Sequence, residues 1–238
     1  MNPAQRVNEH GQPVGEALPD WAGAHYPDVA ALDGTACRVE RLDPLRHAPD
    51  LFKAFGQDRS GAMWTYLSDG PFASQDAVQK WLEASARQDG QVPYAIVPAE
   101  TGRAAGVATF MRIQPADGVV EVGGIALAPP LQKTRAATEA MFLMMQYAFE
   151  ACGYRRYEWK CDALNAPSRR AAERLGFTYD GLFRQAVVYR GRSRDTAWYS
   201  ILDKDWPVAK RAFEAWLAPE NFDAAGRQKR KLADLRAE

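Results

Sequence analysis

The stretch CDALNAPSRRAAERLGF, residues 161–177, places an asparagine, a proline and a serine at the start of a predicted basic helix. Ser168, Ala172 and Leu175 recur at helical spacing, so they share one face, which we expect to point inward. The hydroxyl of Ser168 then lies at the electropositive end of the helix, where negative charge is stabilised. Two simpler interpretations stay open: helix capping alone explains Asn165, and a backbone carbonyl satisfies the serine hydroxyl.

A second stretch, EVGGIALAPPLQKTRAATEA, residues 121–140, has residue types that suit an anion. A predicted strand leads through a loop into a helix start with small side chains, where free N–H groups and the helix dipole bind phosphates. Lys133 and Arg135 add positive charge there. Gly123 and Gly124 inside the strand predict a bulge or the close approach of another group. The alternative is an ordinary strand-loop-helix unit whose alanines serve packing.

The first of two family patterns falls on the anion-binding stretch. Together with the order of elements, both stretches resemble the GNAT (Gcn5-related N-acetyltransferase) superfamily and, within it, the RimJ/RimL-like branch. In that family a (Gln/Arg)-x-x-Gly-x-(Gly/Ala) loop binds the pyrophosphate of acetyl-CoA. Gln132 and Ala137 match its two ends, and Arg135 stands where the family usually has glycine. The resemblance covers residues 35–206.

The second family pattern, Asn-x-x-(Ala/Ser)-x-x-x-Tyr-x-x-x-Gly-Phe, is matched by Asn165, Ser168, Gly176 and Phe177. Ala172 stands where many relatives have the tyrosine that protonates the leaving thiolate. The RimL-like branch tends to use the serine instead, so the resemblance implies that Ser168 is the general acid.

The resemblance implies an N-acyltransferase that moves an acetyl group from acetyl-CoA to a primary amine, of a protein N-terminus or a small molecule, by direct attack. A transferase that uses succinyl-CoA and a non-catalytic acyl-CoA-binding module are the alternatives. Backbone N–H groups of the bulged strand are expected to polarise the thioester carbonyl. The residues expected to bind the cofactor are Ile125, Ala126, Leu127, Gln132, Lys133, Thr134, Arg135, Ala136, Ala137, Thr138, Asn165 and Ser168.

The proton acceptor and the amine pocket are less directly indicated. Glu121 precedes the glycine pair, where several family members carry a glutamate, and it is the first candidate for the base. Two alternatives to a catalytic base stay open: Glu121 is only a solvent-facing strand residue, or the amine loses its proton through water. Trp64, Tyr66 and Phe72 lie in a loop that the family places at the acceptor pocket, although an aromatic cluster at the edge of the core fits the same pattern.

The elements that must position these residues follow the order β-α-α-β-β-β-α-β-α-β-β, and a helix ends the series. Strands at 119–127 and 156–161, linked by one helix, form a single βαβ crossover. The expected fold is α+β, a GNAT-like twisted, mostly antiparallel sheet of about seven strands flanked by helices. We expect an irregular arm at 1–34, an N-acetyltransferase domain at 35–206, and a C-terminal helix with a charged tail at 207–238.

The bulk composition excludes several classes of protein. The 238 residues include 30 Lys plus Arg and 30 Asp plus Glu, so net charge gives no argument for nucleic acid or membrane as partner. Three cysteines without a CxxC pair argue against a disulfide framework or a zinc site, and the three histidines lie far from both motifs. The polar N-terminus lacks the apolar core of a signal peptide. We therefore expect a cytoplasmic enzyme without a metal, and a homodimer stays open because the arm could drape over a partner subunit.

Overall fold

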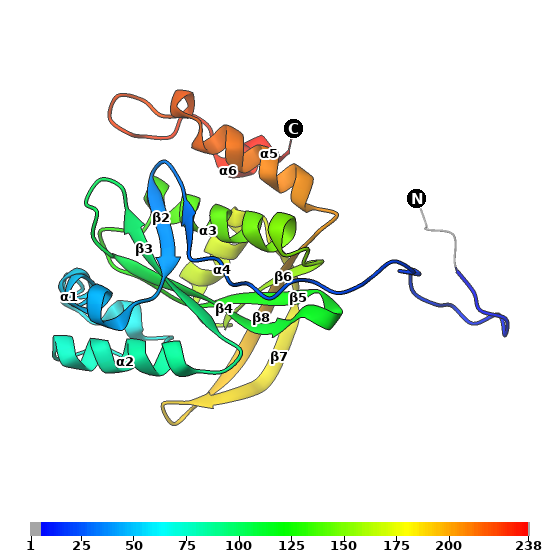
Figure 1. Cartoon of the computed structure of the whole chain (residues 1–238), viewed down its shortest axis with the longest axis horizontal. Coiled ribbons are helices and arrows are strands. Elements are labelled where there is room, and N and C mark those ends of the chain that lie inside the picture. The colour runs from blue at the N-terminus through cyan, green and yellow to red at the C-terminus, as the bar shows by residue number, and fades with distance from the viewer. Residues whose placement is uncertain (1–5, 238) are drawn as a thin grey trace.

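Eight strands form one mixed sheet in the computed structural model, which describes residues 6–237 (Figure 1). Their order across the sheet is β1-β2-β3-β4-β5-β6-β8-β7, and among the described strands only β5 and β6 pair in parallel. The strands are β1 (Ala31–Asp33), β2 (Cys37–Arg41), β3 (Val92–Pro98), β4 (Gly106–Gln114), β5 (Val119–Leu127), β6 (Arg156–Asp162), β7 (Thr178–Tyr189) and β8 (Arg192–Leu202). The predicted α+β architecture is confirmed.

The strand count differs from the expected number by one. The additional strand is β1, which pairs with β2 over three residues, within the segment that the sequence predicts to be irregular. Three residues are too few for an alternating pattern to stand out, so only the pairing partner reveals this strand. The first five residues of the predicted arm lie outside the described residues.

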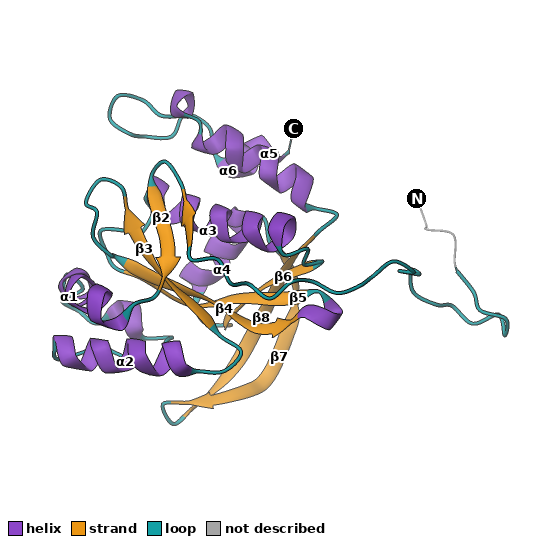
Figure 2. Cartoon of the chain, in the orientation of Figure 1, coloured by secondary structure: helices purple, strands orange, loops and turns teal. Residues whose placement is uncertain are grey.

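Helices cover both faces of the sheet (Figure 2). One face carries α1 (Pro44–Phe55) and α2 (Gln75–Arg87), and the other carries α3 (Arg135–Gln146), α4 (Ala166–Leu175) and α5 (Trp206–Leu217). Nearly every residue of α3 is buried, because this helix lies between the sheet and α5. No helix in the described part of the chain is long and apolar enough to cross a membrane.

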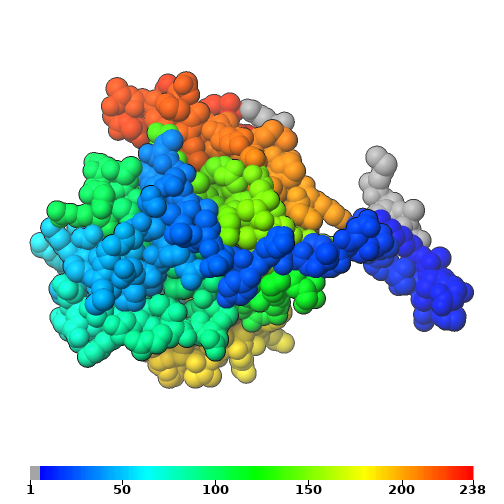
Figure 3. Space-filling view, viewed as in Figure 1, coloured from blue at the N-terminus to red at the C-terminus, as the bar shows by residue number. Residues whose placement is uncertain are grey.

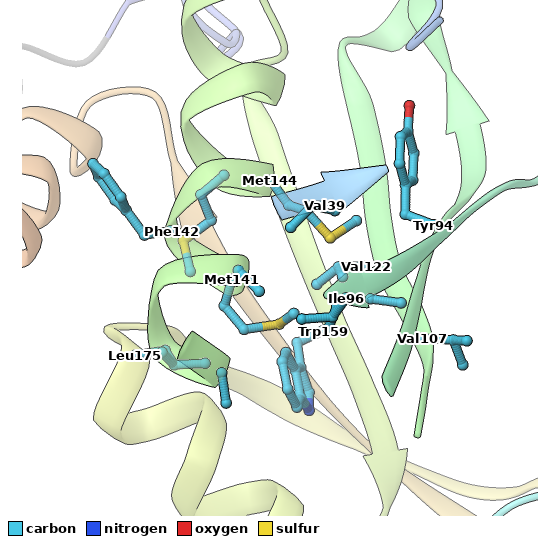
Figure 4. Packing of buried hydrophobic residues seen from close by; sticks show 14 of the residues in the cluster. Val39, Tyr94, Ile96, Val107, Val122, Met141, Phe142, Met144, Trp159 and Leu175 are labelled. Atoms are coloured by element: carbon cyan, nitrogen blue, oxygen red, sulfur yellow. The ribbon is translucent and has the colours of Figure 1, made fainter. Parts of the chain in front are cut away.

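The hydrophobic core between α3 and the sheet fixes the position of that helix. Met141 and Met144 of α3 pack over Val39, Ile96 and Val122 of three different strands (Figure 4). Flexible, unbranched methionine side chains fill irregular gaps of this kind. The helix start that follows β5 is therefore held at a defined place on the sheet.

A buried carboxylate ties α3 to the turn before β2. Glu139 accepts hydrogen bonds from the backbone amides of Thr35, Ala36 and Cys37, at 3.0, 2.6 and 2.8 Å. Gly34 is needed beside them, because a Cβ there would collide with the Glu139 carboxylate. Bonds from three amides to one buried carboxylate stabilise the position of the helix strongly, since each is charge-assisted.

The C-terminal segment packs on the outside of α3 and α4. In α6 (Leu232–Arg236), the Arg236 guanidinium donates to the carbonyls of Arg174 and Glu173, at 3.1 and 3.3 Å, in the last turn of α4. The Arg174 guanidinium lies 5.0 Å from the ring centroid of Trp216 in α5. The far end of α4 is therefore held by the tail of the chain.

The N-terminal arm follows an extended path. Trp21 donates from its indole to the Ala116 carbonyl at 2.7 Å, and the Arg155 guanidinium stacks over its ring. Before this anchor the arm leaves the body of the molecule, in dark blue in Figure 3. The division into an arm, a domain and a C-terminal part stays a prediction.

Candidate functional site

The parallel strands β5 and β6 part halfway along their lengths. Their pairing ends at Val122 and Trp159; from there β5 continues beside β4, and β6 beside β8. Alternate amides of a strand point to opposite edges, and the Ala128 amide donates to the Ala105 carbonyl on the β4 side. The Leu127 amide therefore points away from β4, into the angle between the parting strands.

A bulge in β5 changes the course of this edge. Val107 pairs with Ala126 and Thr109 with Gly123, so two residues of β5 stand opposite one residue of β4. Gly124 adopts a φ of +57°, in the left-handed region that favours glycine. The bulge predicted from the glycine pair is confirmed, and it lies directly before the expected carbonyl donors.

The start of α3 keeps free backbone donors. Thr134 is the N-cap, and its hydroxyl accepts from the Ala137 amide at 3.1 Å. The amides of Arg135 and Ala136 find no acceptor among the described residues. Lys133, just before the cap, adopts a φ of +61° and brings a cation to the same turn. Free N–H groups at the positive end of a helix fit an anion such as a pyrophosphate.

The side chains beside this helix start have structural partners of their own. The Arg135 guanidinium donates to the Leu217 carbonyl of α5 and lies 4.9 Å from the ring centroid of Phe222. Gln132 donates from Nε2 to the Leu127 carbonyl at 2.9 Å, which ties the loop to the end of β5. In this structure the Arg135 guanidinium contacts the C-terminal part of the chain. Its contact with the cofactor stays a prediction.

The start of α4 has its backbone donors in use. The predicted N-cap is confirmed, since Asn165 Oδ1 accepts from the Ser168 amide at 3.1 Å. The Ala166 amide donates to the Leu164 carbonyl, and Pro167 has no N–H to offer. Within the described chain, this helix start therefore presents a side chain, the hydroxyl of Ser168, rather than free amides.

Ser168, in the first turn of α4, packs against β6 close to the point where the strands part. Its oxygen accepts from the Trp159 indole at 3.0 Å rather than bonding a backbone carbonyl, so the hydroxyl proton remains for another acceptor. Burial raises the pKa of the neighbouring Cys161 thiol, and a hydrogen bond with Ser168 partly offsets this rise.

Glu121 is buried on the other face of the sheet, so the solvent-facing alternative is wrong. Its Oε2 lies 2.9 Å from Lys160 Nζ and 3.6 Å from Arg112 Nε, and Lys160 also pairs with Glu158 at 2.6 Å. Burial raises the pKa of the Glu121 carboxyl, while the Lys160 ammonium opposes the rise. Among residues 6–237, no group of three His, Cys, Asp or Glu side chains is placed to hold a metal ion.

A cavity of about 350 Å³ lies between α2 and the face of β4 and β5 that carries the bulge. Trp64 lines it, and the role of this cavity as the acceptor pocket stays a prediction. The Tyr66 hydroxyl instead donates to the Leu164 carbonyl at 3.1 Å, and Phe72 packs edge-on against Trp64, with ring centroids 5.1 Å apart. These two residues support the cavity wall rather than line it.

Several other residues of the cavity wall are not predicted from the sequence. Trp81 of α2 lines the cavity, and so do Thr109 and Met111, which lie two positions apart on one face of β4. Their strand and helix periodicities show that they point inward. Nothing local shows that the helix and the strand leave space between them.

Comparisons with known proteins agree with this geometry. A model of the acetyltransferase (GNAT) domain matches residues 40–178. A GCN5-related N-acetyltransferase from Brucella melitensis is 44% identical, and the match covers 93% of this chain and 100% of that chain, with a TM-score of 0.90. The uncharacterized N-acetyltransferase YnaD of Bacillus subtilis (strain 168) is 23% identical over 141 residues, 59% of this chain and 81% of that protein.

The fold also recurs in a more distant structure. RimL, a ribosomal L7/L12 alpha-N-protein acetyltransferase solved with coenzyme A, is 22% identical, with a TM-score of 0.60 over 72% of this chain and 97% of that chain. Since the domain model spans more than half of the chain, and the Brucella protein matches nearly all of it, this chain belongs to the GNAT family of acetyltransferases.

Proposed function

We propose that the enzyme transfers an acetyl group from acetyl-CoA to a primary amine, of a small molecule or a protein N-terminus, by direct attack. One observation carries the proposal: β5 lies between the proposed thioester site and the cavity through which the amine would enter. The Leu127 amide points into the angle beside α3 and α4, while Gly124 and Ala126 line the cavity on the α2 side. A thioester held along β5 would therefore meet an amine that enters from the cavity.

The cofactor site that we propose follows the free donors. The pantetheine arm would lie along the backbone of Ile125, Ala126 and Leu127, and the pyrophosphate would lie at the α3 start, within the loop Gln132–Thr138. The free amides of Arg135 and Ala136 support this placement, since they have no acceptor among residues 6–237. Acetyl-CoA supplies the activated acyl group, and the protein supplies orientation and charge stabilisation.

We further propose that Ser168 donates the proton to the leaving thiolate and that Glu121 accepts the proton of the amine. A carboxylate is a better base when its pKa lies nearer the working pH, and burial shifts Glu121 in that direction. A Cβ on Gly123 would lie 3.1 Å from Glu121 Oε1 and would collide with Met111, which lines the cavity. The carboxylate thus lies just behind the cavity wall.

The proposal includes a cytoplasmic setting. Cys37, Cys152 and Cys161 are free and buried, as is typical of proteins in a reducing compartment. A homodimer stays open.

A thermal-shift series tests the proposal, followed by an activity assay. Acetyl-CoA at about 100 times its dissociation constant should stabilise the fold by about 2.7 kcal/mol. CoA release, measured as free thiol across a panel of amines, should then depend on both substrates. A larger shift and faster turnover with succinyl-CoA would favour the other donor. Binding without release on any amine would favour a non-catalytic module.

A further inference from the structure

The cavity on the α2 side has an apolar wall that selects among amines, if the proposed function holds. Trp64 and Trp81 meet edge to face, with ring centroids 6.1 Å apart, and Phe72 and Phe55 pack around them. Apart from the carboxylate of Asp69, the lining is apolar or uncharged and comes mainly from the acceptor loop, α2, β4 and β5. Interlocked aromatic rings hold this wall in one shape.

Asp69 is the one ionisable side chain of this lining. Its Oδ2 accepts from the Ser68 hydroxyl at 2.7 Å, which leaves the other oxygen for a ligand. A primary amine reaches the site as an ammonium ion, and a carboxylate at the cavity wall attracts that charge. A ligand carboxylate has no Lys, Arg or His in the lining to pair with, and a second ammonium has no second carboxylate there. Asp69 itself is exposed, so it is the deeper, apolar part of the cavity that disfavours such a charge.

The turn that carries Asp69 is held from across the molecule. Arg190, at the tip of the β7–β8 hairpin, donates to the carbonyls of Ser68 and Gly70, on either side of Asp69. Tyr66, earlier in the same loop, is anchored on the Leu164 carbonyl. The carboxylate therefore has a defined position relative to the aromatic wall, as a specificity-determining group requires.

The volume of the cavity limits the size of the ligand. At about 350 Å³ it lies near the lower end of the range of roughly 300–1,000 Å³ for small-molecule sites. From the wall, the single carboxylate and this volume, we infer that the acceptor is an amine with one positive charge, an apolar body about the size of one aromatic ring, and no carboxylate. Polyamines and free amino acids should therefore be poor acceptors.

The test compares kcat/KM for CoA release among four amines. Three of them each change one property that we infer for the acceptor. Phenethylamine has the inferred features, phenylalanine adds a carboxylate, spermidine replaces the apolar body with further charge, and the dipeptide amide Phe-Gly-NH₂ keeps the ring beside a neutral amide. Phenethylamine should exceed phenylalanine and spermidine by about tenfold, since a further charge carried into the apolar part of the cavity has no partner there. A dipeptide amide as good as phenethylamine would identify a peptide N-terminus as the source of the same chemistry. Spermidine or phenylalanine as the best acceptor would overturn the inference.

Direct binding separates this inference from the proposed function. Phenethylamine should quench tryptophan fluorescence on binding, whether or not acetyl transfer follows. Binding without CoA release would contradict acetyl transfer to such amines, while the inferred selectivity of the cavity would still stand. CoA release that is fastest with spermidine or phenylalanine would support acetyl transfer and contradict the inferred selectivity. An amine of this class that neither binds nor reacts would overturn the inference.

Two variants test whether residues of the cavity determine the selectivity among amines. Asp69→Asn should lower kcat/KM for phenethylamine about threefold, because a partly exposed charge contributes modestly, and should narrow the margin over phenylalanine. Asp76→Asn is the matched control, since Asp76 of α2 pairs with Lys80 and does not line the cavity. Ser85→Trp should fill the cavity and abolish amine binding while acetyl-CoA still raises the melting temperature. Equal effects of the two Asp variants would assign the ammonium to another site.

Discussion

The starts of α3 and α4 each follow a strand of the parallel pair, yet they offer different chemistry. At α3 the cap Thr134 occupies one amide and leaves the amides of Arg135 and Ala136 free. At α4 the cap Asn165 occupies one amide, a turn bond uses the next, and Pro167 removes the third. The first helix start is suited to binding an anion, and the second to positioning a hydroxyl.

The difference shows that a helix N-terminus binds an anion only through backbone amides that have no other hydrogen-bond acceptor. The macrodipole is common to both helices, but hydrogen bonds to an anion come from free N–H groups. We therefore propose that α3 binds the phosphates and that α4 transfers the proton. Each proposal can be tested by a substitution that changes either phosphate binding or proton transfer and leaves the other unchanged.

The largest effect is expected from Ser168→Ala. Loss of a positioned proton donor should lower kcat by about 10²-fold, or about 2.7 kcal/mol in the barrier, with acetyl-CoA affinity nearly unchanged. Trp159→Phe is the control, because it removes the indole donor to Ser168 and keeps the hydroxyl. Steady-state kinetics and calorimetric binding of acetyl-CoA measure the two quantities. Equal losses in rate and affinity would show that the α4 start binds the cofactor instead.

A loss of the same order is expected from Glu121→Gln, because neither helix start provides a proton acceptor. Burial raises the pKa of Glu121 above its ordinary 4.5, so kcat/KM should rise with pH through a limb that lies above that value and needs the ionised carboxylate. The limb should vanish in the variant. Glu158→Gln is the matched control, since Glu158 shares Lys160 but its hydrogen bonds from Lys160 and Arg156 outweigh burial and lower its pKa. An unchanged limb in Glu121→Gln would assign the base to water or to another group.

A tenfold effect is expected from removing one free amide of α3. Proline is tolerated in the first position of a helix, and Thr134 already has the extended backbone that a following proline requires, with φ −90° and ψ 166°. Arg135→Pro should weaken acetyl-CoA binding about tenfold relative to Arg135→Ala, because a hydrogen bond to a charged group contributes about 1.5 kcal/mol or more. The comparison with Arg135→Ala cancels the lost contacts with Leu217 and Phe222.

The two Arg135 variants give a clear contrary outcome. If they bind acetyl-CoA equally well, the free amides do not meet the phosphates, and the anion lies elsewhere. Kd values from titration calorimetry settle the comparison, and circular dichroism confirms that α3 is intact in both variants.

The parts of this site that the sequence predicted are those that depend on local spacing. The Asn165 cap, the inward Ser168 and the bulge at Gly124 each follow from residues within one turn or one strand. The GNAT-like fold follows from the order of elements and the two motifs. In these cases the interaction that decides the structure is near in the chain.

The parts that escaped prediction depend on segments far apart. The hydrogen bond from the Arg135 guanidinium to the Leu217 carbonyl joins residues 82 positions apart, while its contact with the phosphates stays a prediction. The cavity arises because α2 and β4 leave space between them, which no single pattern records. Arg190 reaches the acceptor loop across 120 residues or more. Tertiary packing decides each of these cases, and a sequence pattern shows only which side chains are available for it.

The smallest effects, and the most symmetric test, come from the two caps. Thr134→Ala and Asn165→Ala should each lower the free energy of unfolding by about 1 kcal/mol, because each leaves one helix amide without its acceptor. Their kinetic effects should differ. Asn165→Ala loosens the turn that carries Ser168 and should lower kcat a few-fold, whereas Thr134→Ala disturbs the loop at the phosphates and should raise the KM for acetyl-CoA. If both caps change the same kinetic constant, the two helix starts act as one site, and the separation of binding from proton transfer is wrong.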